Sequence, residues 1–229
     1  MTGVSVAAQG DLSPQTLSQS GRREVRHLLR SYNLDLTAVS CPLRRGLDVA
    51  ENQEARIDFV RQVMSLSFDL GPRLVIVQAG RMPEKEADPA FPLMRDALEA
   101  LARHGDRTGT RLALDAGLES AEVLTAFLGR FDTGSLGVNY NPANLLVSGH
   151  NPYEAARVFR TRILHADAQD ARRVSPNRTA TVPVGHGDID WLLLLGTLEE
   201  VEYHGALDVV GDDAGELGAG VNFLRRVTA

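Results

Sequence analysis

The feature of this sequence that most limits its fold is a repeated alternation of short aliphatic segments with longer helical patterns. The segment LVIVQA, within residues 73–79, is almost wholly apolar, as expected for a strand buried on both faces. Strands are expected at residues 4–8, 34–39, 73–79, 111–115, 135–141, 162–167 and 206–210. An alternation of this kind predicts an α/β fold with a parallel sheet and crossover helices.

The segments between these strands have helical periodicity. In residues 21–31, for example, Val25, Leu28 and Leu29 recur at the spacing of one helix face. Helices are expected at residues 21–31, 51–70, 89–104, 119–131, 152–160, 188–202 and 215–227. Residues 171–188 form the longest stretch without a repeat and are expected to be a loop, made basic by three arginines. A long loop after a strand lies at the carboxyl end of a parallel sheet, where ligands bind.

Two architectures fit this alternation, a doubly wound open sheet and a (β/α)8 barrel, because both are built from units of about 30 residues. No linker rich in Pro, Gly or Ser divides the chain, so residues 1–229 are expected to form one domain. No G-x-G-x-x-G motif follows the first strand, and no Walker loop is present, which disfavours nucleotide-binding folds.

Composition excludes several classes of function. The net charge is −6, so the chain lacks the basic field that phosphate-backbone binding needs, and no nucleic-acid partner is expected. A single cysteine, Cys41, rules out an internal disulfide and a multi-cysteine metal site. The longest aliphatic run, Leu192 to Leu195, is far shorter than the roughly 20 residues of a membrane span. With no signal-peptide pattern at the start, a cytoplasmic location and no membrane partner are expected.

Polar side chains collect where the expected strands end. They are Gln78 and Arg81, Asp115, Asn141 and Asn144, His165, Asp167 and Asp170, and finally Asp208, Asp212 and Asp213. In a barrel these ends meet at one mouth, so the side chains would form one site. The alternative is that they cap helices and form turns, which Asp and Asn favour.

Two segments, NPANLL at 141–146 and VPVGHGDIDW at 182–191, carry a resemblance to a known family. Together with RLALDAGLESAEVLTAF they resemble the xylose-isomerase-like TIM-barrel family of sugar isomerases and epimerases, over about residues 30–212. The resemblance implies a barrel whose four strand ends hold a divalent metal through Glu, Asp, His and Glu. The metal would polarise a sugar carbonyl while the two Glu carboxylates move the neighbouring proton.

Carried over by position, the four metal ligands fall on Asp115, Asn141, Asp167 and Val210, or for the last of them, in a slipped register, on Gly211 or Asp212. None keeps the residue of the family, and Val210 has no ligand atom in its side chain. The resemblance thus implies a degraded site in which Asp115, Asn141 and Asp167 hold Mg or Mn weakly, or no metal at all. Asp115 and His165 are the expected catalytic residues, with Asp208 or Asp212 as replacements for the lost base. Substrate contacts are expected from Gln78, Arg81, Asn144, Asp170 and His186.

Seven strands are one fewer than a complete barrel has, and the first resembles the second strand of the family. A barrel lacking its first strand–helix unit leaves two unpaired edges, so we expect a homodimer or coverage by Met1 to Ser20. The predicted function is that of a sugar or sugar-phosphate isomerase or epimerase acting on a small sugar-like molecule. The alternative is a non-catalytic relative that binds a sugar or a protein. The DNA-repair endonuclease branch fits less well, because it needs a His-rich zinc site and a basic groove.

Overall fold

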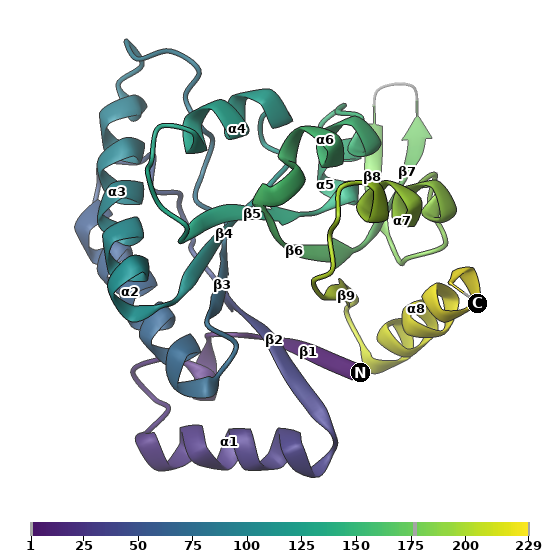
Figure 1. The fold of residues 1–229 in the computed structure, drawn as a ribbon, viewed down its shortest axis with the longest axis horizontal. Coiled ribbons are helices and arrows are strands. Elements are labelled where there is room, and N and C mark those ends of the chain that lie inside the picture. The colour runs from purple at the N-terminus through teal and green to yellow at the C-terminus, as the bar shows by residue number, and fades with distance from the viewer. Residues whose placement is uncertain (1, 176–177, 229) are drawn as a thin grey trace. The chain divides into compact units, whose positions relative to one another are not determined.

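The computed structural model describes residues 2–175 and 178–228, and its main feature is a parallel sheet of seven strands (Figure 1). The strands are β1 (Thr2–Ala7), β2 (Leu34–Cys41), β3 (Leu74–Val77), β4 (Arg111–Asp115), β5 (Leu136–Tyr140), β6 (Ile163–Ala168) and β9 (Leu207–Val209). Their order in the sheet is β1-β2-β3-β4-β5-β6-β9, which follows the chain without a reversal. A doubly wound sheet reverses its order at a switch point, so the order confirms the TIM-barrel topology with one unit missing.

Helices follow the strands as the sequence pattern predicts. They are α1 (Gln19–Ser31), α2 (Gln53–Leu70), α3 (Ala90–Thr108), α4 (Ala121–Leu128), α5 (Pro142–Val147), α6 (Pro152–Phe159), α7 (Trp191–Glu200) and α8 (Ala214–Val227), with short 3-10 turns at Gly10–Leu12 and Arg160–Arg162. The short helix α5 was not expected from the sequence, because six residues are too few to show a period. It begins with the cap Asn141 and with Pro142 in its first turn. No helix in the described part of the chain is long and apolar enough to cross a membrane.

The expected end of α3 before Gly105 is wrong, since the helix continues to Thr108. A Cβ atom at Gly105 would lie 2.6 Å from the Thr110 carbonyl oxygen and 2.7 Å from Ser135 Cβ. Gly105 therefore allows close packing inside the helix. The helix ends instead at Gly109, whose φ of 68° is the left-handed conformation typical of a C-terminal cap.

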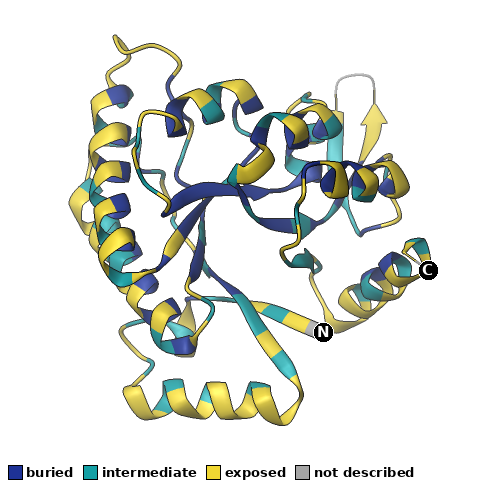
Figure 2. Ribbon diagram, in the orientation of Figure 1, coloured by how far each residue is buried: buried dark blue, intermediate teal, exposed yellow. Residues whose placement is uncertain are grey.

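The chain divides into two compact units, and the boundary passes through β5. Unit 1 comprises Met1–Asp115 and Ala126–Val138, and its core packs α2 and α3 on β2 to β4. Val63, Met64 and Leu98 on the helices are fully buried, as are Val39 and Leu112 on the strands. Figure 2 shows this buried face of α2 and α3, whereas α1 is exposed or half-buried along its whole length.

Unit 2 comprises Ala116–Thr125 and Asn139–Ala229. After β6 it contains an antiparallel hairpin of β7 (Asp170–Ser175) and β8 (Arg178–Val182), so the expectation of a loop over residues 171–188 is wrong for these strands. The β-branched Thr179, Thr181 and Val182 favour a strand, and this signal was missed because the arginines obscure the pattern.

The start of the chain forms the end strand of the sheet. Residues Thr2–Ala7 pair in parallel with β2, beginning with Thr2 opposite Leu34. This segment therefore forms the sheet edge and does not cover it, so the expectation of coverage by Met1 to Ser20 is wrong for these residues. Of the two expectations for the edges, the homodimer stays a prediction.

Candidate functional site

Three of the residues predicted for the site belong to unit 1. Asp115 is the last residue of β4 and is half-buried, while Gln78 directly follows β3 and is exposed. Arg81 is also exposed, and with Asp48 and Lys85 it lines a surface cavity of about 590 Å³. The other predicted residues, Asn141, Asn144, His165, Asp167, Asp170 and His186, belong to unit 2.

In unit 2, polar side chains at the carboxyl ends of β5, β6 and β9 form one hydrogen-bonded chain. His165 and Asp167 share one face of β6, because side chains alternate along a strand, and Ala166 and Ala168 are buried on the other face. Asp167 lies opposite Asp208 of β9 in the strand register. From β5, Asn139 Nδ2 donates to Asp167 Oδ2 at 2.8 Å.

The chain continues through the imidazole of His165. Asn139 Oδ1 lies 2.8 Å from His165 Nδ1, and His165 Nε2 lies 3.1 Å from Asp208 Oδ2. Since the Asn139 amide donates to a carboxylate, its oxygen accepts the Nδ1 proton of His165. His165 Nε2 and Asp208 Oδ2 then share a second proton, which is bonded either to the imidazole or to the carboxyl group. The carboxylates of Asp208 and Asp167 are thus connected through one imidazole and one amide.

The carboxyl group of Asp167 has a perturbed pKa within this hydrogen-bonded chain. Its side chain is 15% exposed, and burial raises the pKa of its carboxyl group above the ordinary range. The nearby Asp208 also raises this pKa, while His165 and the amides of Asn139 and Asn141 lower it in part. A carboxyl group at a strand end with a raised pKa is a candidate for proton transfer.

Asn141 occupies the position of a metal ligand in the resemblance, yet its amide is already engaged. Its Oδ1 accepts the backbone N–H of Asn144 at 3.0 Å, which caps α5. Its Nδ2 donates to Asp167 Oδ2 at 3.3 Å and to Gln169 Oε1 at 3.2 Å. The amide oxygen that a cation would need is therefore a helix cap, and the amide nitrogen faces the carboxylate.

These contacts do not fit a tightly held divalent metal. Asp167 Oδ2 accepts two amide N–H groups, and Val210, the position of the last ligand, is exposed and has no donor atom in its side chain. Within residues 2–175 and 178–228, no group of three or more His, Cys, Asp and Glu side chains is placed to hold a metal ion. The Asn139 and Asn141 amides compensate the charge of Asp167 in unit 2.

Asp170, predicted to contact a substrate, instead holds the GHGDIDW loop. It is 1% exposed, and its Oδ1 accepts the backbone N–H groups of Ala171 at 2.8 Å and Ile189 at 3.2 Å. Its Oδ2 accepts the N–H of Gly185 at 3.1 Å and Trp191 Nε1–H at 2.9 Å. Both oxygens are thus satisfied by this loop. A Cβ atom at Gly187 would overlap the Asp170 carboxylate, which explains the second glycine of the motif.

Two further predicted residues of unit 2 are Asn144 and His186. Asn144 is half-buried in the first turn of α5, with its Cβ against Gly117. His186 is exposed, and its carbonyl oxygen accepts a hydrogen bond from Arg172. The sequence interpretation missed Asn139 and Gln169. Each lies two residues from a predicted site residue, so the period of a strand was the signal for both.

Solved structures with this fold are known. The chain is similar to a xylose isomerase domain protein from Planctomyces limnophilus, with 19% identity over 99% of this chain and 96% of that one and a TM-score of 0.88. It is also similar to a D-tagatose 3-epimerase-like protein, with 16% identity, coverage of 99% and 88%, and a TM-score of 0.84. A xylose isomerase-like TIM barrel protein from Mycobacterium smegmatis in complex with magnesium has 17% identity, coverage of 99% and 83%, and a TM-score of 0.78.

Identities this low establish the fold alone. No curated protein matches the chain. The family model described as xylose isomerase-like TIM barrel matches residues 1–227, almost the whole sequence. With the strand order and the resemblance of the NPANLL and VPVGHGDIDW segments, this match shows that the chain belongs to the xylose isomerase-like TIM barrel family.

Proposed function

We propose that this protein is a sugar isomerase or epimerase that works without a resident metal ion, with Asp167 as its proton-transfer group. The observation that carries the proposal is the environment of Asp167, a partly exposed carboxyl group with a raised pKa held by the amides of Asn139 and Asn141. The solved structures that are similar to this chain include a D-tagatose 3-epimerase-like protein, and this similarity supports a small sugar-like substrate. A cytoplasmic location stays a prediction from the sequence.

The chemistry needs one group that takes a proton from the carbon next to a sugar carbonyl and then returns it. Asp167 in its ionised form accepts that proton as the C–H bond breaks, and the electron pair of that bond moves toward the carbonyl oxygen to give an enediolate. In an isomerase the same proton returns to the neighbouring carbon on the same face, while the hydroxyl proton moves to the oxygen of the former carbonyl. In an epimerase the proton must reach the first carbon from the opposite face, so a water molecule supplies it and Asp167 returns its own proton to the solvent. A raised pKa makes the ionised carboxylate a stronger base than an ordinary aspartate.

His165 and Asp208 act on this reaction through Asn139. His165 is 1% exposed, so it does not reach a substrate and is a positioning residue. Its Nδ1–H fixes the oxygen of Asn139, which turns the amide nitrogen toward Asp167. The Asp208 carboxylate holds the imidazole in this orientation from the other side.

A second candidate is a relative that binds a sugar without converting it. The observation that favours it is the exposed Val210, which provides no acid or base at the position of the last Glu. One carboxyl group would then serve to bind hydroxyl groups, as Asp side chains commonly do in sugar sites.

Hydrogen exchange separates the two candidates. The protein is incubated in D2O with EDTA and a panel of ketoses and ketose phosphates, and NMR follows deuterium entry next to the carbonyl. We expect exchange that is lost in Asp167→Asn and kept in Asp58→Asn, an exposed aspartate that pairs with Arg61. Thermal stabilisation by a sugar without exchange would favour the binding protein. Exchange that needs an added metal and survives in Asp167→Asn would contradict the proposal.

A further inference from the structure

A pocket in unit 2 lies between the turn that joins α5 to α6 and the hairpin β7–β8. Its volume is about 660 Å³, which is within the range of pockets for small molecules. The residues on which its chemistry depends are Leu146, His150, Tyr153, Arg173, Arg178 and Asp188. None of the residues lining it belongs to the hydrogen-bonded chain around Asp167, so this pocket is a separate site.

Two arginines face this pocket, and no side chain in the described part of the hairpin or the lining pairs with either of them. Arg173 is on β7 and Arg178 on β8, and in the hairpin Arg173 lies opposite Thr179, the neighbour of Arg178. Within the described residues, neither guanidinium forms an ion pair or a hydrogen bond with another side chain. Their neighbour Arg172, in contrast, donates to the carbonyl oxygen of His186. The hairpin thus places two positively charged guanidinium groups at one wall of the pocket, where they are available to a ligand.

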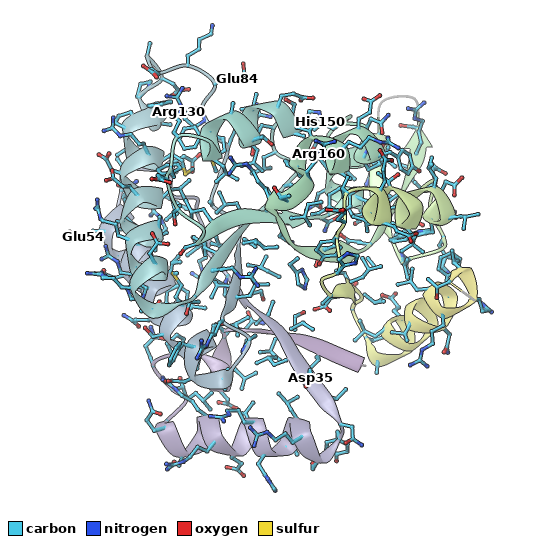
Figure 3. All side chains as sticks on the ribbon, in the orientation of Figure 1. Asp35, Glu54, Glu84, Arg130, His150 and Arg160 are labelled. Carbon is cyan, nitrogen blue, oxygen red and sulfur yellow. The ribbon has the colours of Figure 1, made fainter. Side chains whose placement is uncertain are left out.

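The opposite wall adds to the attraction for an anion. His150, labelled in Figure 3, lies in the turn before α6, and the positive end of that helix faces the same turn. Asp188, the one carboxylate among the described residues of the lining, accepts the backbone N–H of Arg173 at 2.7 Å and so is partly compensated. Leu146, Pro152 and Ile189 provide an apolar surface beside these charges.

We propose that this pocket binds a small phosphate monoester, with Arg173 and Arg178 on its phosphate group. A phosphate monoester carries almost two negative charges near neutral pH, which two guanidinium groups match, and the planar fork of arginine fits phosphate oxygens in pairs. The apolar surface and Tyr153 then contact the organic part, so the ester binds more tightly than inorganic phosphate. This inference is independent of the function proposed for Asp167, because the two sites share no residue.

Isothermal titration tests the pocket with three probes at constant ionic strength: fructose 6-phosphate, inorganic phosphate and fructose. We expect fructose 6-phosphate to bind at least tenfold more tightly than inorganic phosphate, and its affinity, unlike that of fructose, to depend on Arg173 and Arg178. Arg173→Ala and Arg178→Ala should each weaken fructose 6-phosphate at least tenfold, and Arg178→Lys, which keeps the charge, should weaken it less. Arg172→Ala is the matched control, since it removes the same charge from the same hairpin outside the lining.

Three outcomes would overturn the inference. They are no binding of fructose 6-phosphate, equal affinity for inorganic phosphate, and an equal loss in Arg172→Ala, which would indicate attraction to the basic hairpin as a whole. Asp167→Asn should bind fructose 6-phosphate as the unchanged protein does. Loss of sugar exchange in that variant with intact phosphate binding would separate the two sites.

Discussion

The carboxylate of Asp167 accepts two amide N–H groups and lies 3.6 Å from the imidazole of His165, so its protonation depends on its neighbours. Burial raises the pKa of this group in the folded protein, whereas the unfolded chain has the ordinary value near 4. Its contribution to stability is therefore complete below about pH 4 and is lost as the pH rises through the raised pKa.

This linkage predicts a pH-dependent effect of Asp167→Asn, because asparagine does not ionise. The free energy of unfolding of the variant, relative to that of the unchanged protein, should be constant below about pH 4 and should rise above it until the raised pKa is passed. Urea unfolding at a series of pH values measures this difference. Asp58→Asn is the exposed control, and a difference for Asp167→Asn that does not change with pH would contradict the assignment.

Asn141 provides a second prediction at the residue scale. Asn141→Asp restores the residue of the family and keeps the cap of α5, but it places a second carboxylate beside Asp167. We expect a loss of about 1–3 kcal/mol of stability near pH 7.5, because the carboxylate of Asp167 loses a donor and gains a like charge. Added Mn²⁺ should recover part of this loss, since paired carboxylates are ligands for hard cations.

Urea unfolding with and without Mn²⁺ checks this prediction. Asn151→Asp is the matched control, because Asn151 also caps a helix through its side-chain oxygen but is not bonded to Asp167. An equal effect of Mn²⁺ on both variants, or on the unchanged protein, would show that the cation acts elsewhere.

Two glycines of unit 2 provide a third prediction. In Gly187→Ala the new methyl group would overlap the Asp170 carboxylate and lie 2.5 Å from the Ala171 carbonyl oxygen, so we expect a loss of about 1–3 kcal/mol. Gly196 lies within α7 with open space around it, and Gly196→Ala should instead stabilise the protein by about 0.5–1 kcal/mol. Urea unfolding measures both, and equal effects would show that the loop adapts to the methyl group.

At the scale of elements, α1 is held much less firmly than the helices that cover the core of unit 1. None of its side chains is buried, and Leu28, expected on its apolar stripe, is 54% exposed. An ion pair of 2.5 Å between Arg22 and Asp69 connects α1 to α2. In α3, by contrast, Met94, Leu98 and Leu101 are fully buried.

This difference predicts that α1 opens separately from the core. Backbone amides in residues 19–31 should exchange with deuterium at least tenfold faster than those in residues 90–108, because opening α1 exposes little apolar surface. Exchange followed by mass spectrometry at micromolar concentration measures both segments. Equal protection at high dilution would show that α1 belongs to the same cooperative unit as α3.

For the whole molecule, the seven-stranded order leaves β1 and β9 with one neighbour each among the described strands. Unpaired strand edges favour association, so a homodimer is the expected assembly, and the exposed Leu28 and Tyr32 would add apolar surface. Light scattering should give a mass near twice 24.8 kDa. Ser5→Lys places a charge on the edge strand β1 and should weaken the dimer, whereas Ser65→Lys on α2 should not. A mass of 24.8 kDa at all concentrations would contradict this expectation.

The sequence by itself determined the order of the seven strands of the parallel sheet and of the longer helices, because the periods of two and 3.6 residues are properties of neighbouring residues. It also indicated most of the polar residues at the carboxyl ends of β5 and β6, including His165 and Asp167. The same local patterns failed at α5, which is too short to show a period, and at Gly105, whose small size serves packing against Ser135.

Only the tertiary structure decided what these polar residues do. Asn139 and His165 are 26 residues apart, and His165 and Asp208 are 43 apart, so their contacts depend on the register of strands joined by intervening helices. Asp170 accepts a hydrogen bond from the indole of Trp191, which is 21 residues away, so this contact also depends on the tertiary structure. A residue type specifies which hydrogen bonds are possible, but the partner is selected by strand register and burial, which a single sequence does not contain.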